Sequence, residues 1–232
     1  MKWRLLIALL GVLPAPVLAA EAVPNLRVCG RPQSLEHEHG RTKSIPVPAA
    51  VRSIVRTSRY HWAILTLGGR TICDDLSDVG ELHDVTLTPD RRFLTYTWYG
   101  YEVYGQHLVD RTGRGKIYEI GDKPMFSPSR RLFATLDQTE SEFGMQSGLA
   151  MWRVTPATVV AVARLEDIPR MHDWRIDGWA GEACLRMSAI PHELIKGGDQ
   201  DITKLPRTRY LAKPVRRAWQ VLPVGGANRC PG

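Results

Sequence analysis

From residue 44 onward, short apolar runs alternate with turn residues along the chain. Most of these runs are about four to seven residues long and rich in β-branched or aromatic side chains, which is typical of strands. Only residues 190–202 have the pattern of a short helix, which Gly197 and Gly198 would end. The pattern therefore predicts an all-β fold between residues 44 and 222.

Two turn segments support this prediction. Residues 67–70, with Gly68 and Gly69, predict a tight two-residue hairpin. Residues 110–113 predict a type I turn followed by Gly113 with a positive φ, which is a three-residue hairpin with a bulge. Consecutive strands are therefore expected to pair antiparallel.

An internal repeat suggests how the strands are grouped. Residues 87–95 align with residues 126–135, and Pro89 and Pro128 are 39 positions apart. Residues 174–179 form a weaker third copy without a proline. A period of about 40 residues with four short strands is typical of a propeller blade. We therefore expect a β-propeller-like fold of about five short blades, complete or incomplete, and a β-sandwich is the alternative.

The first 20 residues have the composition of a cleaved signal peptide. A basic start precedes an apolar run at residues 5–13, and small residues follow Pro14 and Pro16. The run is shorter than the roughly 20 residues that a membrane-spanning helix needs. We expect residues 21–232 to form a single β-rich, propeller-like domain in the periplasm or outside the cell. Membrane contact is expected only through the signal peptide before cleavage.

The charge distribution does not indicate a nucleic-acid partner. Removing residues 1–20 deletes Lys2 and Arg4 and no acid, so the formal net charge falls from +7 to +5. The remaining basic residues are scattered and matched by acids rather than gathered in a stripe. The expected partner is another exported protein.

Four widely spaced cysteines favour disulfides over a metal or redox site. No Cys-x-x-Cys pair occurs, and in an oxidising compartment such spacing predicts two disulfides. The sequence leaves all three pairings open. The candidates are Cys29, Cys73, Cys184 and Cys230.

Residues 96–155 contain three segments that resemble a known group of proteins. Residues 104–114, 124–134 and 149–154 are similar to uncharacterised exported bacterial proteins with single-blade signatures. The Phe-Ser-Pro-x-Arg-Arg motif at residues 126–131 also resembles the blade turn of Tol-type β-propellers. The usual turn has Asp-Gly after the proline, whereas this chain has Arg91 and Arg130 at the glycine position. The resemblance implies propeller-like blades and carries over no catalytic residue.

An aromatic cluster around Gly100 is the candidate binding site. Aromatic side chains bury large areas at a small entropic cost and often anchor recognition surfaces. The alternative is that half of them point inward and fill the space between blades. The cluster comprises Trp98, Tyr99, Tyr101 and Tyr104.

A group of aspartates is the alternative metal site. Asp74, Asp75 and Asp78 supply the hard oxygen ligands that Ca²⁺ prefers, although their spacing is not that of a helix-flanked calcium loop. A polar loop between strands is the simpler interpretation. No Gly-x-Ser-x-Gly elbow occurs, and the acid beside His83 or His172 would point to the opposite face of a strand.

These observations predict an exported, non-catalytic β protein that binds a macromolecule and needs no cofactor. Its compartment suggests a cell-wall hydrolase that it inhibits, because some exported propellers act in this way. One alternative is a calcium-dependent phosphohydrolase resembling the propeller phytases, with Asp74, Asp75 and Asp78 as ligands. Another alternative is a structural component of the envelope.

Overall fold

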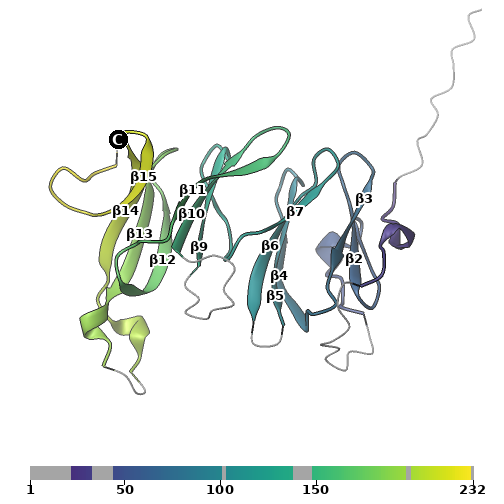
Figure 1. Cartoon of the computed structure of the whole chain (residues 1–232), viewed down its shortest axis with the longest axis horizontal. Helices are drawn as coiled ribbons and strands as arrows, with labels where there is room; N and C mark the ends of the chain where they lie inside the picture. The colour runs from purple at the N-terminus through teal and green to yellow at the C-terminus, as the bar shows by residue number, and fades with distance from the viewer. Residues whose placement is uncertain (1–21, 33–43, 101–102, 138–147, 197–199, 231–232) are drawn as a thin grey trace, which may run out of the picture.

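Four antiparallel sheets stand side by side in a row, from the N-terminal part of the chain to the C-terminal part (Figure 1). The computed structural model describes residues 22–32, 44–100, 103–137, 148–196 and 200–230, so the expected signal peptide lies outside the described residues. Within each sheet, strands that follow one another in the chain are hydrogen-bonded neighbours. The all-β prediction is confirmed.

The first sheet has three strands and each of the other three sheets has four. Within the described ranges, the segment expected to be helical contains one short 3-10 helix, η3 (His192–Leu194), and a second, η4 (Ile202–Lys204), begins at its last residue. Two more, η1 (Leu26–Val28) and η2 (Ala49–Val51), precede the first sheet. The strands are β1 (Val55–Thr57), β2 (His61–Leu65) and β3 (Thr71–Asp75) in the first sheet; β4 (Glu81–Leu87), β5 (Phe93–Tyr99), β6 (Tyr104–Asp110) and β7 (Lys116–Glu119) in the second; β8 (Met125–Phe126), β9 (Leu132–Asp137), β10 (Gly148–Val154) and β11 (Val159–Leu165) in the third; and β12 (Met171–Trp179), β13 (Leu185–Pro191), β14 (Thr208–Val215) and β15 (Ala218–Pro223) in the fourth.

The described sheets form an open row rather than a closed ring (Figure 1). The third and fourth sheets lie against each other with β8 beside β12 and β11 beside β15, so both present their first strands to the same side. Five blades were expected from the length of the chain, whereas the described residues form four sheets.

Both inner sheets bury their two faces, because successive side chains of a strand point to opposite sides. In β5, Phe93 packs toward the third sheet while its neighbour Leu94 packs toward the first. In β10, Met151 contacts the fourth sheet and Trp152 the second. The core is therefore divided into three layers. They are centred on Trp62, Ile64, Leu94, Tyr96 and Val109; on Phe93, Leu108, Phe133 and Trp152; and on Met151, Trp174, Leu185, Met187 and Tyr210.

The outer faces of the two end sheets carry the disulfides. The two expected disulfides are present, and each joins neighbouring segments: Cys29 pairs with Cys73 and Cys184 with Cys230. Cys73 and Cys184 alternate with inward-facing residues, so each bond fastens a terminal segment to the outer side of the row. Two disulfides indicate an oxidising environment outside the cytoplasm.

None of the helices in the described part of the chain has the length and apolar character needed to cross a bilayer.

The two good copies of the repeat form the same turn in the second and third sheets. Thr88 N and Ser127 N donate to the carbonyls of Phe93 and Leu132 at 2.9 Å in both cases. Arg91 and Arg130 occupy the glycine position of the usual turn with φ values of 59° and 58°. The expected third copy at residues 174–179 is wrong, because these residues lie inside β12.

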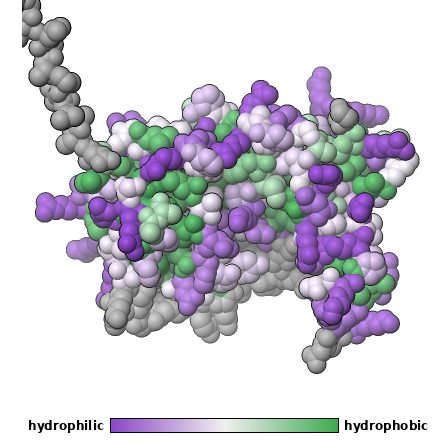
Figure 2. Space-filling view, turned by 180° about the vertical axis from the view of Figure 1, so that it is seen from behind, coloured by the Kyte–Doolittle hydropathy of each residue, from purple (hydrophilic) through white to green (hydrophobic). Residues whose placement is uncertain are grey.

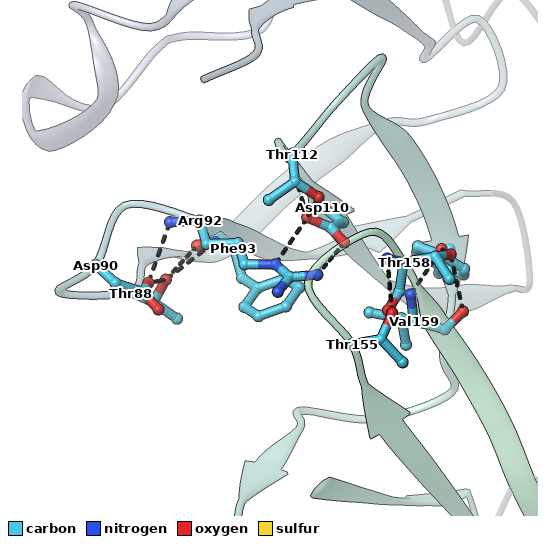
Figure 3. A network of polar contacts seen from close by, with 10 residues as sticks. Thr88, Asp90, Arg92, Phe93, Asp110, Thr112, Thr155, Thr158 and Val159 are labelled. Atoms are coloured by element: carbon cyan, nitrogen blue, oxygen red, sulfur yellow. Dashed lines mark hydrogen bonds and ion pairs between the residues drawn. The ribbon is translucent and has the colours of Figure 1, made fainter. Parts of the chain in front are cut away.

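Side chains also brace the first of these turns (Figure 3). Asp90 accepts hydrogen bonds from the Thr88 hydroxyl and the Arg92 amide. Arg92 then reaches the end of β6, where its Nε and Nη2 donate to the two carboxylate oxygens of Asp110 at 3.0 and 2.7 Å. Asp110 is 2% exposed, and the bidentate contact with Arg92 offsets the cost of burying its carboxylate charge.

Both predicted hairpins exist, but their loop lengths differ from the prediction. Two hydrogen bonds between Thr66 and Arg70 close the first loop. The Thr66 amide donates to the Arg70 carbonyl, and the Arg70 amide donates to the Thr66 hydroxyl. This loop therefore has three residues, with Gly69 at φ 76°. The second loop spans residues 111–115, where Gly115 N donates to Thr112 O.

Arg130 provides a test of the turn, because its left-handed backbone disfavours β-branched residues. We expect Arg130→Val to lower the free energy of unfolding by about 1–2 kcal/mol, and Arg130→Gly to change it by less than about 0.5 kcal/mol. Urea unfolding measures both values. Arg153→Val, at an exposed position in β10, is the matched control and should be nearly neutral. Equal losses for Arg130→Gly and Arg130→Val would contradict this account.

Candidate functional site

Tyr99 and Tyr104 form an exposed aromatic pair at one end of the second sheet. Tyr99 is the last residue of β5 and Tyr104 the first of β6, and the two lie directly opposite each other in the strand register. Their rings stack with centroids 5.9 Å apart and an interplanar angle of 28°. The side chains are 45% and 50% exposed, and they are the exposed aromatic side chains within the described ranges. We call them the tyrosine pair.

The other two residues of the predicted cluster are placed differently. Tyr101 lies outside the described residues. Trp98 points inward, because it alternates with Tyr99, and packs on the core between the first and second sheets. A Cβ at Gly105 would lie 2.8 Å from the Trp98 ring, so glycine is required where the indole crosses β6. Part of the aromatic cluster was expected to point inward and fill the space between sheets, and Trp98 does so.

The tyrosine pair lies at the less buried end of β5 and β6. From Phe93 to Tyr96 every residue of β5 is buried, whereas Thr97 and Trp98 next to the pair are half-buried. On β6, Gly105 and Gln106 beside Tyr104 are buried. The rings therefore project from the end of two paired strands that are anchored in the core further along.

Polar groups surround the tyrosine pair. The His83 ring meets Tyr99 edge-on with centroids 5.2 Å apart, and His83 Nε2 lies 2.9 Å from a Glu81 carboxylate oxygen. Partial desolvation raises the pKa of Tyr104, and the charges of Asp137 and Asp122 raise it further. Tyr104 therefore stays a neutral hydrogen-bond donor at neutral pH. An apolar ring with a polar tip and charged neighbours suits recognition of a folded protein surface.

The three aspartates of the alternative metal site do not share one position. Asp74 and Asp75 are adjacent in β3 and point to opposite faces, and Asp78 is exposed in the following turn. Asp75 accepts a hydrogen bond from the Ser77 amide at 3.0 Å. No group of three or more potential metal ligands of the His, Cys, Asp or Glu type occurs among the described residues. The calcium alternative stays a prediction.

Asp74 belongs instead to a buried polar network between the first and second sheets. Its Oδ2 accepts a hydrogen bond from the Tyr96 hydroxyl and lies 2.9 Å from His107 Nδ1. Desolvation raises the pKa of Tyr96 well above its ordinary value, and the Asp74 charge reinforces this shift. Burial also raises the pKa of Glu119, which lies opposite His107 in the register. Sequence reasoning missed this network because Asp74 meets Tyr96 and His107 only where the first and second sheets pack together.

A substitution at Asp74 tests whether its buried hydrogen bonds hold the first and second sheets together. We expect Asp74→Ala to lower the free energy of unfolding by about 3 kcal/mol, because it leaves the Tyr96 hydroxyl and the His107 ring without their buried acceptor. The exposed neighbour Asp78 gives the control: Asp78→Ala should cost less than about 0.5 kcal/mol. Chemical denaturation of both variants decides the matter, and similar losses would show that Asp74 does not hold the two sheets together.

No protein-family model matches this chain, and a search of curated proteins found no match either. The resemblance to Tol-type propeller blades therefore stays a prediction.

Proposed function

We propose that this chain is an exported, non-catalytic protein that binds another exported protein through the tyrosine pair. The observation that carries the proposal is the stacking of Tyr99 and Tyr104 in an exposed position at the end of two paired strands that are buried further along. Tyrosine is enriched at the energetic centres of protein interfaces. The charged neighbours Glu81 and Asp122 would form a polar rim around such a centre.

The periplasm or the extracellular space is the proposed location. The signal-peptide pattern of residues 1–20 supports it, and so do the two disulfides. The expected target is a cell-wall hydrolase that the protein inhibits, since such enzymes share this compartment. A structural role in the envelope is the competing prediction, and it needs no defined binding residue.

A propeller-like relationship between the sheets is part of the same proposal. Two features support it: each complete sheet is a four-stranded meander, and the second and third sheets repeat the same turn between their first two strands. In this proposal the sheets are blades of an incomplete propeller, with the disulfide-linked terminal segments covering the end blades.

Removal of both rings tests the binding proposal. The purified protein should slow cell-wall digestion by periplasmic extracts of the bacterium that produces it. The double variant Tyr99→Ala/Tyr104→Ala should need at least about tenfold more protein for the same inhibition, because interface hot spots contribute about 2 kcal/mol or more. Val160→Ala removes an exposed apolar side chain from β11 and should behave like the wild type.

Two results would contradict the proposal. One is a pull-down from a periplasmic extract that recovers no partner, together with unchanged wall digestion. The other is an equal loss of inhibition in the tyrosine variant and in Val160→Ala, because the effect would then not depend on the tyrosine pair. Unchanged melting temperatures of the variants would show that their folds are intact.

A further inference from the structure

A hollow of about 920 Å³ lies on the outer face of the fourth sheet, against β13 and β14. Residues 224 and 228–230 of the C-terminal segment form one wall of it. The Cys184–Cys230 disulfide fixes this wall to the start of β13, and Lys213 Nζ donates to the Arg229 carbonyl at 3.0 Å. Its size is in the range of small-molecule sites, which bury most of a ligand of drug-like size.

Four arginines line this hollow, and the strand register explains why they gather there. Arg186 and Ser188 share the outward face of β13 because they are two residues apart. Arg209 lies directly opposite Ser188, on the neighbouring strand β14. Arg207 precedes β14 and its Nε donates to the Ser188 hydroxyl at 3.1 Å. Arg229 contributes from the C-terminal wall.

The charge of the hollow is only partly balanced. Arg207 pairs with Asp173, to which its Nη1 donates at 2.7 Å, but Asp173 lies outside the lining and is shared with Arg175. Although partial burial opposes it, hydrogen bonding by Arg207 and Arg175 holds the pKa of Asp173 below its ordinary value. The lining has one acid, Asp177, whose carboxylate accepts a hydrogen bond from Ser188 at 2.9 Å. The four arginines and one acid of the lining therefore carry a net charge of about +3, which the pair with Asp173 offsets only in part.

The guanidinium groups of Arg186, Arg209 and Arg229 have no hydrogen bond or ion pair within the part of the chain that the structure describes. Like charges that share a hollow repel one another, so a matching anion would be stabilised there. Figure 2 shows hydrophilic side chains gathered at the lower right, on the projecting segment around η3 and η4, with apolar patches among polar side chains elsewhere on this face.

We propose that this hollow binds the dianionic phosphate group of a small organic phosphate. Arginine presents planar pairs of N–H donors that match phosphate oxygens. Donors from three chain positions would suit a tetrahedral phosphate, and the positively charged lining would balance its two negative charges near neutral pH. The organic part would lie against Leu211 and Val224, two apolar residues of the lining.

Titration of the full-length protein with glycerol phosphate at constant ionic strength tests this site. Calorimetry should show saturable binding, with one phosphate per chain. Arg186→Gln and Arg209→Gln should each raise the dissociation constant about tenfold, because each removes charged hydrogen bonds to the phosphate. Arg217→Gln, an exposed arginine outside the hollow, is the control and should leave it unchanged.

The same titration distinguishes the sources of phosphate. A glycerol phosphodiester carries one negative charge and should bind about tenfold more weakly than the monoester. Tighter binding of the diester would still place a phosphate group in the hollow, but its source would then be a lipid headgroup or a wall polymer and not a small phosphate monoester.

Absence of saturable binding would overturn the proposal, as would an equal weakening by Arg217→Gln and Arg186→Gln. The tyrosine variant should retain phosphate binding, because the tyrosine pair lies on the second sheet. Failure of one proposal therefore leaves the other intact.

Discussion

The structure depends on the two-residue alternation of side chains in strands that are covered on both faces. Each inner strand contributes to two core layers at once, as Phe93 and Leu94 do in β5. An inner sheet therefore has little stability without its neighbours, because each face would expose a layer of large apolar side chains. The end sheets have one open face each, and disulfide-linked terminal segments lie on these faces.

The same layering decides where polar groups are tolerated. Between sheets, a carboxylate needs partners: Asp74 has Tyr96 and His107, and Asp110 has Arg92. On the outer face of the fourth sheet, water is available and arginines can remain without partners. The inter-sheet carboxylates therefore stabilise the fold, whereas the exposed hairpin end and the outer arginine hollow are free to bind other molecules.

Local patterns predicted the strands, the antiparallel connections and the paired repeat turns, because these depend on residues close together in the chain. They also indicated that some aromatics near Gly100 would point inward, as Trp98 does. They did not predict the Asp74 network or the arginine hollow, whose members meet only through strand register and sheet packing. The number of sheets was also missed, because length alone cannot show how much chain lies outside the strands.

Hydrogen exchange of the backbone amides tests the shared burial of the inner sheets most directly. If Phe93, Leu94, Met151 and Trp152 join neighbouring sheets as described, the slowest amides of β5, β6, β9 and β10 should all exchange with one free energy, equal to that of global unfolding. Exchange of β9 and β10 at a much lower free energy than β5 and β6 would show that the sheets unfold separately, and would contradict the account.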